Sequence, residues 1–239
     1  MNLLILQQEQ FISPSEAVTS ARQTLHIRKI LKLNKGDALQ LGELNGNMGS
    51  GIIAEDAGDH FIVHQIKLTD SPPPKLPVRL ILGMPRPQMI KRILQTVATM
   101  GVDHLALIQS SRVEKSFWQS PSATPESIHE HLILGLEQGV ATQLPTVSIH
   151  KRFRPFVEDD LTPLSENSIK LIADPGGENE PALHSSSQAI SLAIGPEGGF
   201  LKQEVEKFRE LGFDSIHLGR RILKVETAVP VLLAKLFHF

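Results

Sequence analysis

The sequence predicts an α/β protein of two parts, in which a small, mostly β domain precedes a larger domain with a parallel sheet covered by helices. Ser71–Pro77 holds four prolines in seven residues, so it cannot continue a helix or a central strand. Before it, short apolar runs alternate with turn signals; after it, apolar strands alternate with helical patterns. We therefore expect a first domain at 1–70, a linker at 71–77 and a second domain at 78–239.

The composition narrows the class of protein. Hydrophobic residues make up 41% of the 239 residues and charged residues 21%, as in folded globular proteins. The chain has no cysteine, which excludes disulfides, thiolate metal sites and a cysteine nucleophile. No segment approaches the roughly 18 apolar residues of a membrane span, and the N-terminus lacks a basic export signal. We expect a cytoplasmic protein without a membrane segment.

Each predicted element rests on a local pattern. In the first domain, turn signals at Asn34, Gly42 and Glu55 separate short apolar runs, and the alternation that begins at Phe61 predicts a half-buried strand. In the second domain, apolar runs predict strands and helical spacing predicts helices. The strands are Val78–Met84 and runs near His104, Lys170, Ala189 and Ser215; the helices are Ile90–Met100, Pro125–Gln143, Leu201–Leu211 and one from about Glu226.

Basic residues are concentrated locally, although the net charge is −2. The segment 79–115 has six basic and two acidic residues, and 22–35 has five basic residues and no acid. Lys151, Arg152 and Arg154 form a third basic patch. Such patches favour a phosphate-bearing partner, and a solvated surface is the alternative for each one. The histidines do not indicate a metal site, because His129 and His131 lie two apart instead of at ligand spacing.

Two glycine-containing turns follow predicted strands. The first, IGPEGGF, begins at Ile194, and the second, LGRRILKVETA, spans Leu218–Ala228. Neither has the glycine spacing of a dinucleotide-binding turn or the Gly-Lys-Ser/Thr of a P-loop. Ligands of open α/β sheets bind outside the carboxyl ends of the strands, so we expect both turns to form one pocket. An α/β enzyme with a nucleotide in these turns is one interpretation.

The pairing of these two motifs resembles the closing motifs of the RsmE family, the 16S rRNA uridine-N3 methyltransferases of the SPOUT class. HIRKILKLNKGD from His26, GMPRPQMIKRILQTVATMGV from Gly83 and EQGVATQLP from Glu137 extend the resemblance over most of the chain. It implies an N-terminal PUA-like RNA-binding β-barrel, a linker and an α/β trefoil-knot methyltransferase domain. It also implies a homodimer that binds S-adenosylmethionine and acts on 16S rRNA or the small ribosomal subunit, with no metal.

The resemblance assigns roles to residues of this sequence. Arg221 and Glu226 are the implied catalytic residues, and a guanidinium at Arg221 suits negative charge on the base. The general base stays unassigned, because Glu197 or Glu226 could take the proton or serve as a cap or ion-pair partner. Asp174 borders the expected pocket. The implied cofactor-binding residues are Ile194, Gly195, Glu197, Gly198, Gly199, Leu218, Gly219, Ile222, Leu223, Thr227 and Ala228. The implied RNA-binding residues are Arg28, Lys29, Lys32, Arg86, Arg92 and Arg112.

The sequence also departs from the family pattern. Relatives usually have Pro, Arg and Thr where this chain has Arg220, Lys224 and Val225. The alternative is therefore a noncatalytic or differently targeted RNA-binding paralogue. Trp118, beside Phe117, could stack on an unpaired base, although a core or hinge role is the favoured interpretation.

Overall fold

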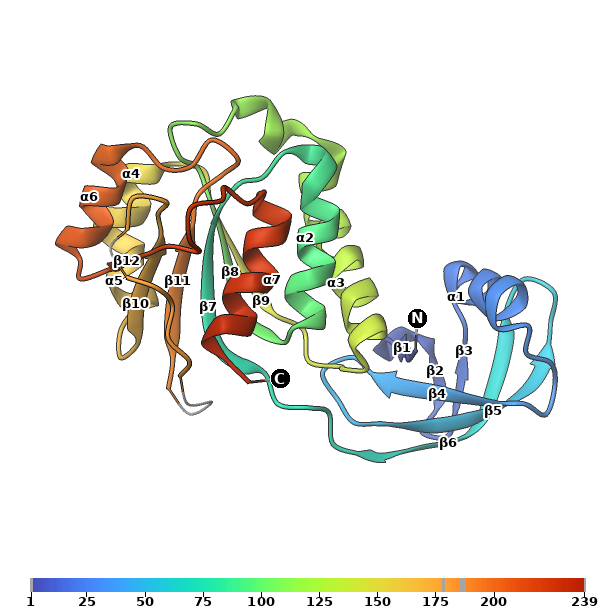
Figure 1. Ribbon diagram of the computed structural model, residues 1–239. Coiled ribbons are helices and arrows are strands. Elements are labelled where there is room, and N and C mark those ends of the chain that lie inside the picture. The colour runs from blue at the N-terminus through green and yellow to red at the C-terminus, as the bar shows by residue number, and fades with distance from the viewer. Residues whose placement is uncertain (1, 178, 185–187, 239) are drawn as a thin grey trace. The chain divides into compact units, whose positions relative to one another are not determined.

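The computed structural model describes residues 2–177, 179–184 and 188–238. The chain divides into two compact units (Figure 1). The first comprises Met1–Pro74 and Ile133–Leu144, and the second comprises Lys75–Leu132 and Pro145–Phe239. A stretch that the sequence places in the second domain is thus part of the first unit. Its fully buried Glu137 explains this, because the carboxylate and backbone carbonyl of Glu137 accept hydrogen bonds from the N-terminal segment.

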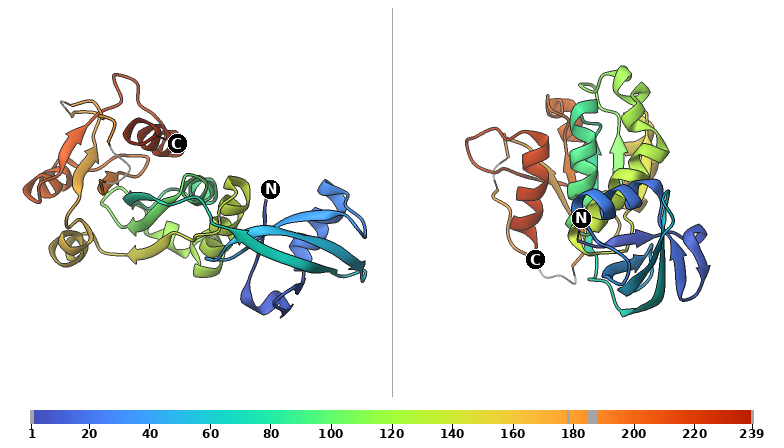
Figure 2. Two further views of the ribbon diagram at one scale, coloured as in Figure 1. Left: turned by 90° about the horizontal axis from the view of Figure 1, so that it is seen from below. Right: turned by 90° about the vertical axis from the view of Figure 1, so that its right-hand side faces the viewer.

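The first unit is a curved, six-stranded mixed sheet (Figure 2). Its strand order is β1-β4-β5-β6-β3-β2, in which β1 pairs in parallel with β4 and all other neighbours are antiparallel. This arrangement confirms the mostly β character predicted for this part of the chain. The strands are β1 (Leu4–Leu6), β2 (Phe11–Ser13), β3 (Glu16–Val18), β4 (Ala38–Glu43), β5 (Met48–Asp56) and β6 (Phe61–Asp70).

A short helix that the sequence analysis did not predict crosses this sheet's core. It consists of α1 (Ala21–His26) and one π-helical turn, η2 (Ile27–Leu31). The helix begins at Ser20, whose hydroxyl accepts from the backbone N–H of Gln23 while the Gln23 side chain accepts in return. It ends at Lys32, which has a positive φ of 53°. Gln23, Thr24 and Ile27 are buried, and Ile27 packs into the core of the sheet, while Arg28, Lys29 and Lys32 are exposed.

The second unit contains a six-stranded sheet in which all neighbouring strands are parallel, as predicted. Its order is β12-β10-β11-β7-β8-β9. The chain first forms β7, β8 and β9, which lie in this order toward one edge of the sheet. It then crosses to the opposite side of β7, where β10, β11 and β12 form the other half of the sheet. That crossing makes the carboxyl ends of β10 and β11 a natural place for a ligand. The strands are β7 (Leu76–Gly83), β8 (Val102–Ile108), β9 (Thr146–His150), β10 (Ile169–Ala173), β11 (Ile190–Ile194) and β12 (Asp214–Ile216).

Helices cover both faces of this sheet, so the central strands are apolar on both sides. All five residues of β11 are buried. On one face α2 (Pro87–Thr99) lies beside α7 (Val225–Leu236); on the other lie η5 (Phe156–Asp160), α5 (Leu161–Leu164) and α6 (Lys202–Glu210) (Figure 1). The shorter elements of the chain are η1 (Gln8–Gln10), η3 (Lys115–Gln119), η4 (Pro121–Ala123) and α4 (Phe153–Pro155), and the helix before β9 is α3 (Pro125–Gly139).

Backbone conformation explains where the helices end. Gly101 and Gly212 have positive φ angles of 71° and 85° and follow α2 and α6 closely, as predicted. The predicted end of α3 at Gln143 is wrong, because the helix ends at Gly139. Val140 has a φ of 53°, and the N–H of Ala141 bonds back to the carbonyl of Leu136. A valine in this conformation is uncommon, so residue preferences could not locate this end.

Candidate functional site

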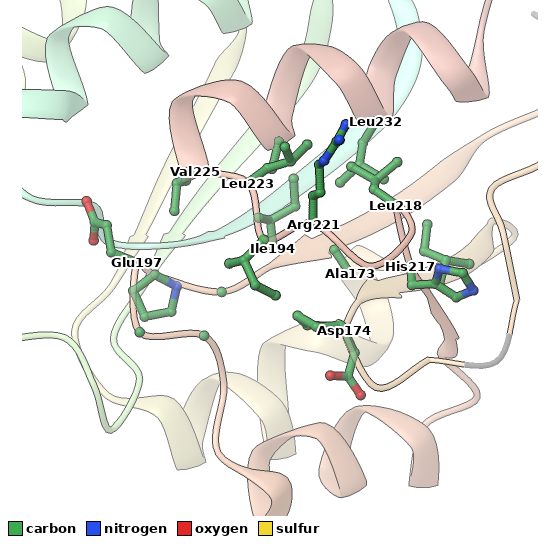
Figure 3. A pocket seen from close by; sticks show the side chains of 18 of the residues that line it. Ala173, Asp174, Ile194, Glu197, His217, Leu218, Arg221, Leu223, Val225 and Leu232 are labelled. Carbon is green, nitrogen blue, oxygen red and sulfur yellow. The ribbon is translucent and has the colours of Figure 1, made fainter.

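A cavity of about 300 Å³ lies at the carboxyl ends of β10, β11 and β12 (Figure 3). Three loops and the start of α7 form its wall. Both glycine-containing turns found in the sequence contribute, so the prediction that they share one pocket is confirmed. The wall consists of residues 173–175, 194–199, 216–219, 221–223 and 225, together with Ala228 and Leu232.

The first turn is tight because its glycines allow backbone segments to touch. A Cβ on Gly195 would lie 2.8 Å from the backbone nitrogen of Phe200 and 3.0 Å from the carbonyl carbon of Gly199. Gly199 has a φ of 71°, and its N–H donates to the carbonyl of Pro196 at 2.7 Å. Only glycine fits both positions without strain. At Gly198 the limit is different, since a Cβ there would meet the side chain of Arg112 at 2.9 Å.

A backbone N–H and a side chain from elsewhere in the unit hold this turn. The backbone N–H of Arg86, the residue before α2, donates to Glu197 Oε1 at 2.9 Å. A carboxylate at a helix N-terminus is stabilised by the free N–H groups and the helix dipole. In Figure 3 the Glu197 carboxylate points away from the centre of the cavity. Arg112 donates to the carbonyl of Gly198 from the loop after β8.

The second turn supplies unpaired backbone groups. Gly219 has a φ of 87°, and its N–H donates to His217 Nδ1 at 2.9 Å. Within the described part of the chain, the backbone N–H groups of Leu218, Ile222 and Leu223 donate to no other group. Backbone donors that stay unpaired need a partner from solvent or a ligand. These three therefore equip the cavity to bind a polar ligand along its edge.

Arg221 and Asp174 are charged members of the wall. Arg221 is exposed and has no hydrogen-bond or ion-pair partner among the described residues; its guanidinium extends toward α7 in Figure 3. Asp174 directly follows β10 and borders the pocket, as predicted. Its Oδ1 accepts from the N–H of Gly176 at 3.1 Å, and Oδ2 lies 3.9 Å from Arg209 Nη2. Asp174 thus shapes its own loop, whereas Arg221 is free to meet a ligand.

The structure does not bring every predicted residue into the cavity. Glu226 and Thr227 lie in the first turn of α7, outside the wall, so their assigned roles remain predictions. The predicted cofactor residues in the wall are Ile194, Gly195, Glu197, Gly198, Gly199, Leu218, Gly219, Ile222, Leu223 and Ala228. His217, Val225 and Leu232 also line the cavity but were not predicted: His217 directly precedes the second motif, Val225 lies within it, and Leu232 belongs to the apolar pattern of α7.

The predicted RNA-binding residues lie on both units. In the first unit Arg28 and Lys29 belong to η2 and Lys32 caps it; Arg28 also pairs with Asp56 at 2.5 Å and lies over the ring of Phe61. In the second unit, Arg86 precedes α2, Arg92 is exposed on α2, and Arg112 contacts the first glycine turn. Their contact with RNA stays a prediction.

Among residues 2–177, 179–184 and 188–238, no group of three or more His, Asp or Glu side chains could hold a metal ion. No helix in the same residues has the length and apolar character to cross a membrane.

The family model of an RNA methyltransferase domain matches residues 72–237, which include both glycine turns. A ribosomal RNA small subunit methyltransferase E from Treponema pallidum is 32% identical over 235 residues, covering 95% of this chain and 87% of the relative. The chain belongs to the ribosomal RNA small subunit methyltransferase E family, which confirms the resemblance seen in its motifs.

Solved structures show the same fold. The ribosomal RNA small subunit methyltransferase E of Neisseria gonorrhoeae, bound to S-adenosyl methionine, superposes with a TM-score of 0.77 at 20% identity, covering 98% of this chain and 95% of that one. A protein of Legionella pneumophila in complex with the bound cofactor SAM gives a TM-score of 0.75 at 21% identity, covering 98% of this chain and 96% of that one. The predicted fold class, an N-terminal barrel-like domain followed by an α/β methyltransferase domain of the SPOUT class, is confirmed.

Proposed function

We propose that this protein transfers a methyl group from S-adenosylmethionine to N3 of a uridine in the 16S rRNA of the small ribosomal subunit. The observation that carries the proposal is the cavity itself, which both family motifs line at the carboxyl ends of three parallel strands. The name of the Treponema pallidum relative supports ribosomal RNA of the small subunit as the substrate. The SAM-bound Neisseria gonorrhoeae and Legionella pneumophila structures support the cofactor.

The residues present fit S-adenosylmethionine. A cavity of about 300 Å³ is within the range of small-molecule sites, which are mostly apolar with a few placed polar groups. Ile194, Leu218 and Leu223 supply apolar walls for a purine ring, and the unpaired N–H groups of the second turn supply donors for its polar atoms. Gly195, Gly198 and Gly199 leave three positions of the opposite turn without a side chain.

The bound cofactor supplies an electrophilic methyl group on a sulfonium. The protein's own residues must position the uridine and stabilise the charge that develops when N3 loses its proton. Arg221 is suited to this, because it lines the cavity and its guanidinium lacks a partner among the described residues and stays charged. Glu197 acts as a positioning residue in this scheme, since its Oε1 already accepts from Arg86. Glu226 stays a candidate catalytic residue.

Substrate binding and assembly complete the proposal. Cations on both units, Lys29, Lys32 and Arg92 among them, would hold the RNA by its phosphates. We also propose a cytoplasmic homodimer. Its support is α7, where Val229, Leu232 and Leu233 are buried while Pro230 and Val231 on a further face are only partly covered. Light scattering that gives a monomer mass at micromolar concentration would contradict the dimer.

Methyl transfer to purified RNA tests the proposed function. The purified protein is mixed with S-adenosylmethionine that carries a radiolabelled methyl group and with small subunits, large subunits or free 16S rRNA. We expect label in the 16S rRNA of small subunits or in free 16S rRNA, and none in large subunits. Binding of both cofactor and 16S rRNA without transfer would identify a noncatalytic RNA-binding protein instead.

A further inference from the structure

Trp118 lies on a surface of the second unit that neither family motif includes. It belongs to η3 in the loop between β8 and α3, the green segment at the top of Figure 1, and is only partly buried. It is the only tryptophan of the chain, which has no tyrosine. An aromatic side chain that is left partly exposed in a loop calls for an explanation other than core packing.

Hydrogen bonds fix the orientation of this indole. Its Nε1 donates to Gln109 Oε1 at 2.6 Å. The same amide donates from Nε2 to the carbonyls of Ser110 and Val113 at 2.7 and 2.8 Å. Three hydrogen bonds therefore hold the amide of Gln109, so the indole ring that donates to this amide has little freedom to rotate. A ring fixed in advance costs less entropy when it binds a flat ligand.

The surroundings of the ring are cationic. Lys151 Nζ lies 6.0 Å from the ring centroid, and Arg152, Lys115 and Arg112 are exposed on the two adjoining loops. Glu114 is the one acidic residue in the segment 109–119. Arg154, the next cation, already pairs with Glu158 at 2.7 Å. Unpaired cations beside an aromatic face are the combination that binds single-stranded nucleic acid, the phosphates by charge and the bases by stacking.

The same loop reaches the cofactor cavity. Arg112 donates to the carbonyl of Gly198 in the cavity wall, and the N–H of Ser111 donates to Glu204 Oε1 at 2.8 Å. Glu204 is 4% exposed and also accepts from the N–H of Leu201 at the start of α6. Only a few residues therefore separate the indole from the wall of the cavity, and two contacts hold the connecting loop in place.

From these observations we propose that Trp118 is a stacking platform for an unpaired base of the RNA substrate, with Lys151 and Arg152 binding the adjacent phosphates. The proposal rests on the proposed function, because the base belongs to a nucleotide near the one that enters the cavity. It adds a substrate-positioning surface made by the loop after β8 and the loop after β9.

Tryptophan fluorescence tests the platform, because all of it comes from Trp118. The protein is titrated with purified 16S rRNA, and free N-acetyltryptophanamide is titrated in parallel to correct for light absorbed by the RNA. Filter retention of radiolabelled 16S rRNA measures binding independently. We expect a saturable fall in emission that follows the filter-binding curve. Binding without any corrected change in emission would overturn the platform and leave the proposed function intact.

Variants separate stacking from a structural role. Trp118→Leu should weaken binding of 16S rRNA about 5- to 150-fold, as the loss of one base-stacking contact does, while affinity for S-adenosylmethionine stays at the parental level. Trp118→Phe should retain most of the RNA affinity, and Phe117→Leu is the matched control. Lys151→Ala should lower the salt dependence of binding by roughly 0.7 in log–log slope; Trp118→Leu should not alter that slope.

Three further outcomes would overturn the platform. Parental RNA affinity in a folded Trp118→Leu variant overturns it, and so does equal loss in Phe117→Leu. If Trp118→Leu does not fold, the emission of the parental protein still decides. A parental protein that binds neither 16S rRNA nor S-adenosylmethionine would overturn the proposed function together with the platform.

Discussion

The glycines of the cavity differ in what their missing side chains allow. Gly199 and Gly219 have positive φ angles, so any other residue there is strained. Gly195 instead provides space, since its turn closes onto its own backbone. An alanine would therefore strain the backbone at Gly199 or Gly219, but would clash with the turn itself at Gly195. A substitution at Gly195 thus tests the shape of the turn most directly.

The first prediction concerns Gly195→Ala. Its Cβ would have to displace the backbone of Phe200 and Gly199, which opens the turn, so affinity for S-adenosylmethionine should fall about tenfold or more, by analogy with overpacked sites. Calorimetric titration measures it. Gly176→Ala is the matched control, because a Cβ there would have only ordinary contacts, at 3.6 Å from the Asp174 carboxylate. Equal affinities in the two variants would contradict this account of the turn.

Arg221 carries the second prediction. Arg221→Ala should bind cofactor and RNA almost as the parent does, but single-turnover methylation should fall on the order of 10²–10³-fold, as when other charge-stabilising donors are removed. Arg221→Lys should recover only part of the rate, because an ammonium lacks the planar fork of donors. Rapid-quench measurement of methyl transfer decides the matter. A parental rate in Arg221→Ala would make Arg221 a surface residue.

Histidine burial gives a prediction about pH. Burial, together with the nearby cations Arg79 and Lys75, lowers the pKa of His104, whose Nε2 bonds to Ser148 Oγ at 2.9 Å. Because the folded state favours neutral His104, this residue does not lower the free energy of unfolding above its unfolded pKa of about 6.5. The free energy of unfolding decreases as the pH falls from the unfolded pKa toward the lower folded pKa. Between pH 7.5 and 5.5, urea unfolding should show a smaller decrease in the free energy of unfolding for His104→Gln than for the parent. His26, whose pKa burial also lowers, should keep part of the loss in both proteins.

At the scale of elements, carboxylates at helix starts fix the loops of the site. Glu197 accepts from the residue before α2, and Glu204 accepts from the start of α6 and from Ser111 in the loop after β8. Each contact joins a loop to a helix that packs on the sheet. The cavity is thus held by elements whose own positions come from buried apolar faces, such as Ile90, Ile93 and Val97 of α2.

The sequence predicted elements well where apolar periodicity and glycine agree. In α2 the apolar spacing and Gly101 both indicate the same end, and the structure confirms it. It failed where one unusual backbone conformation decides, as at Val140, or where a helix is anchored by few buried residues, as α1 is. Pairing between distant segments was also invisible, because nothing local shows that Glu137 belongs with Arg22.

That pairing carries the fourth prediction. Glu137 is fully buried, and both of its oxygens accept from Arg22 at 2.8 Å. Arg22→Ala leaves an uncompensated buried charge, which should cost about 3 kcal/mol in the free energy of unfolding. The matched control is Arg154→Ala, which breaks a solvent-exposed pair with Glu158 and should change the free energy of unfolding far less than Arg22→Ala. Urea denaturation that gives equal losses would show that the Glu137 pair does not stabilise the first unit.

At the scale of the whole molecule, the proposed function assigns RNA binding to cations of both units. The fifth prediction compares cations of η2 and its cap. Lys29→Ala with Lys32→Ala should lower the log–log salt slope of 16S rRNA binding by roughly 0.7–0.9 for each lysine. Arg28→Ala should change it less, because Arg28 is already paired with Asp56. Filter binding at several salt concentrations measures the slopes, and a larger effect from Arg28 would contradict this ranking.

The candidate site was predictable only in part, since motifs define backbone turns better than side-chain directions. Both turns meet in one cavity as expected, yet Glu226 and Thr227 lie outside its wall while His217 and Leu232 lie in it. Which residues of α7 face the cavity depends on how the helix packs, and that is a property of the whole unit.

The most direct test of the central claim is nucleoside mass spectrometry of 16S rRNA from a strain that lacks this gene. The proposed function predicts the loss of a single N3-methyluridine, which returns when the parental gene is restored and does not return with Arg221→Ala at equal protein levels. An unchanged set of methylated nucleosides in the small-subunit rRNA of the deletion strain would contradict the claim.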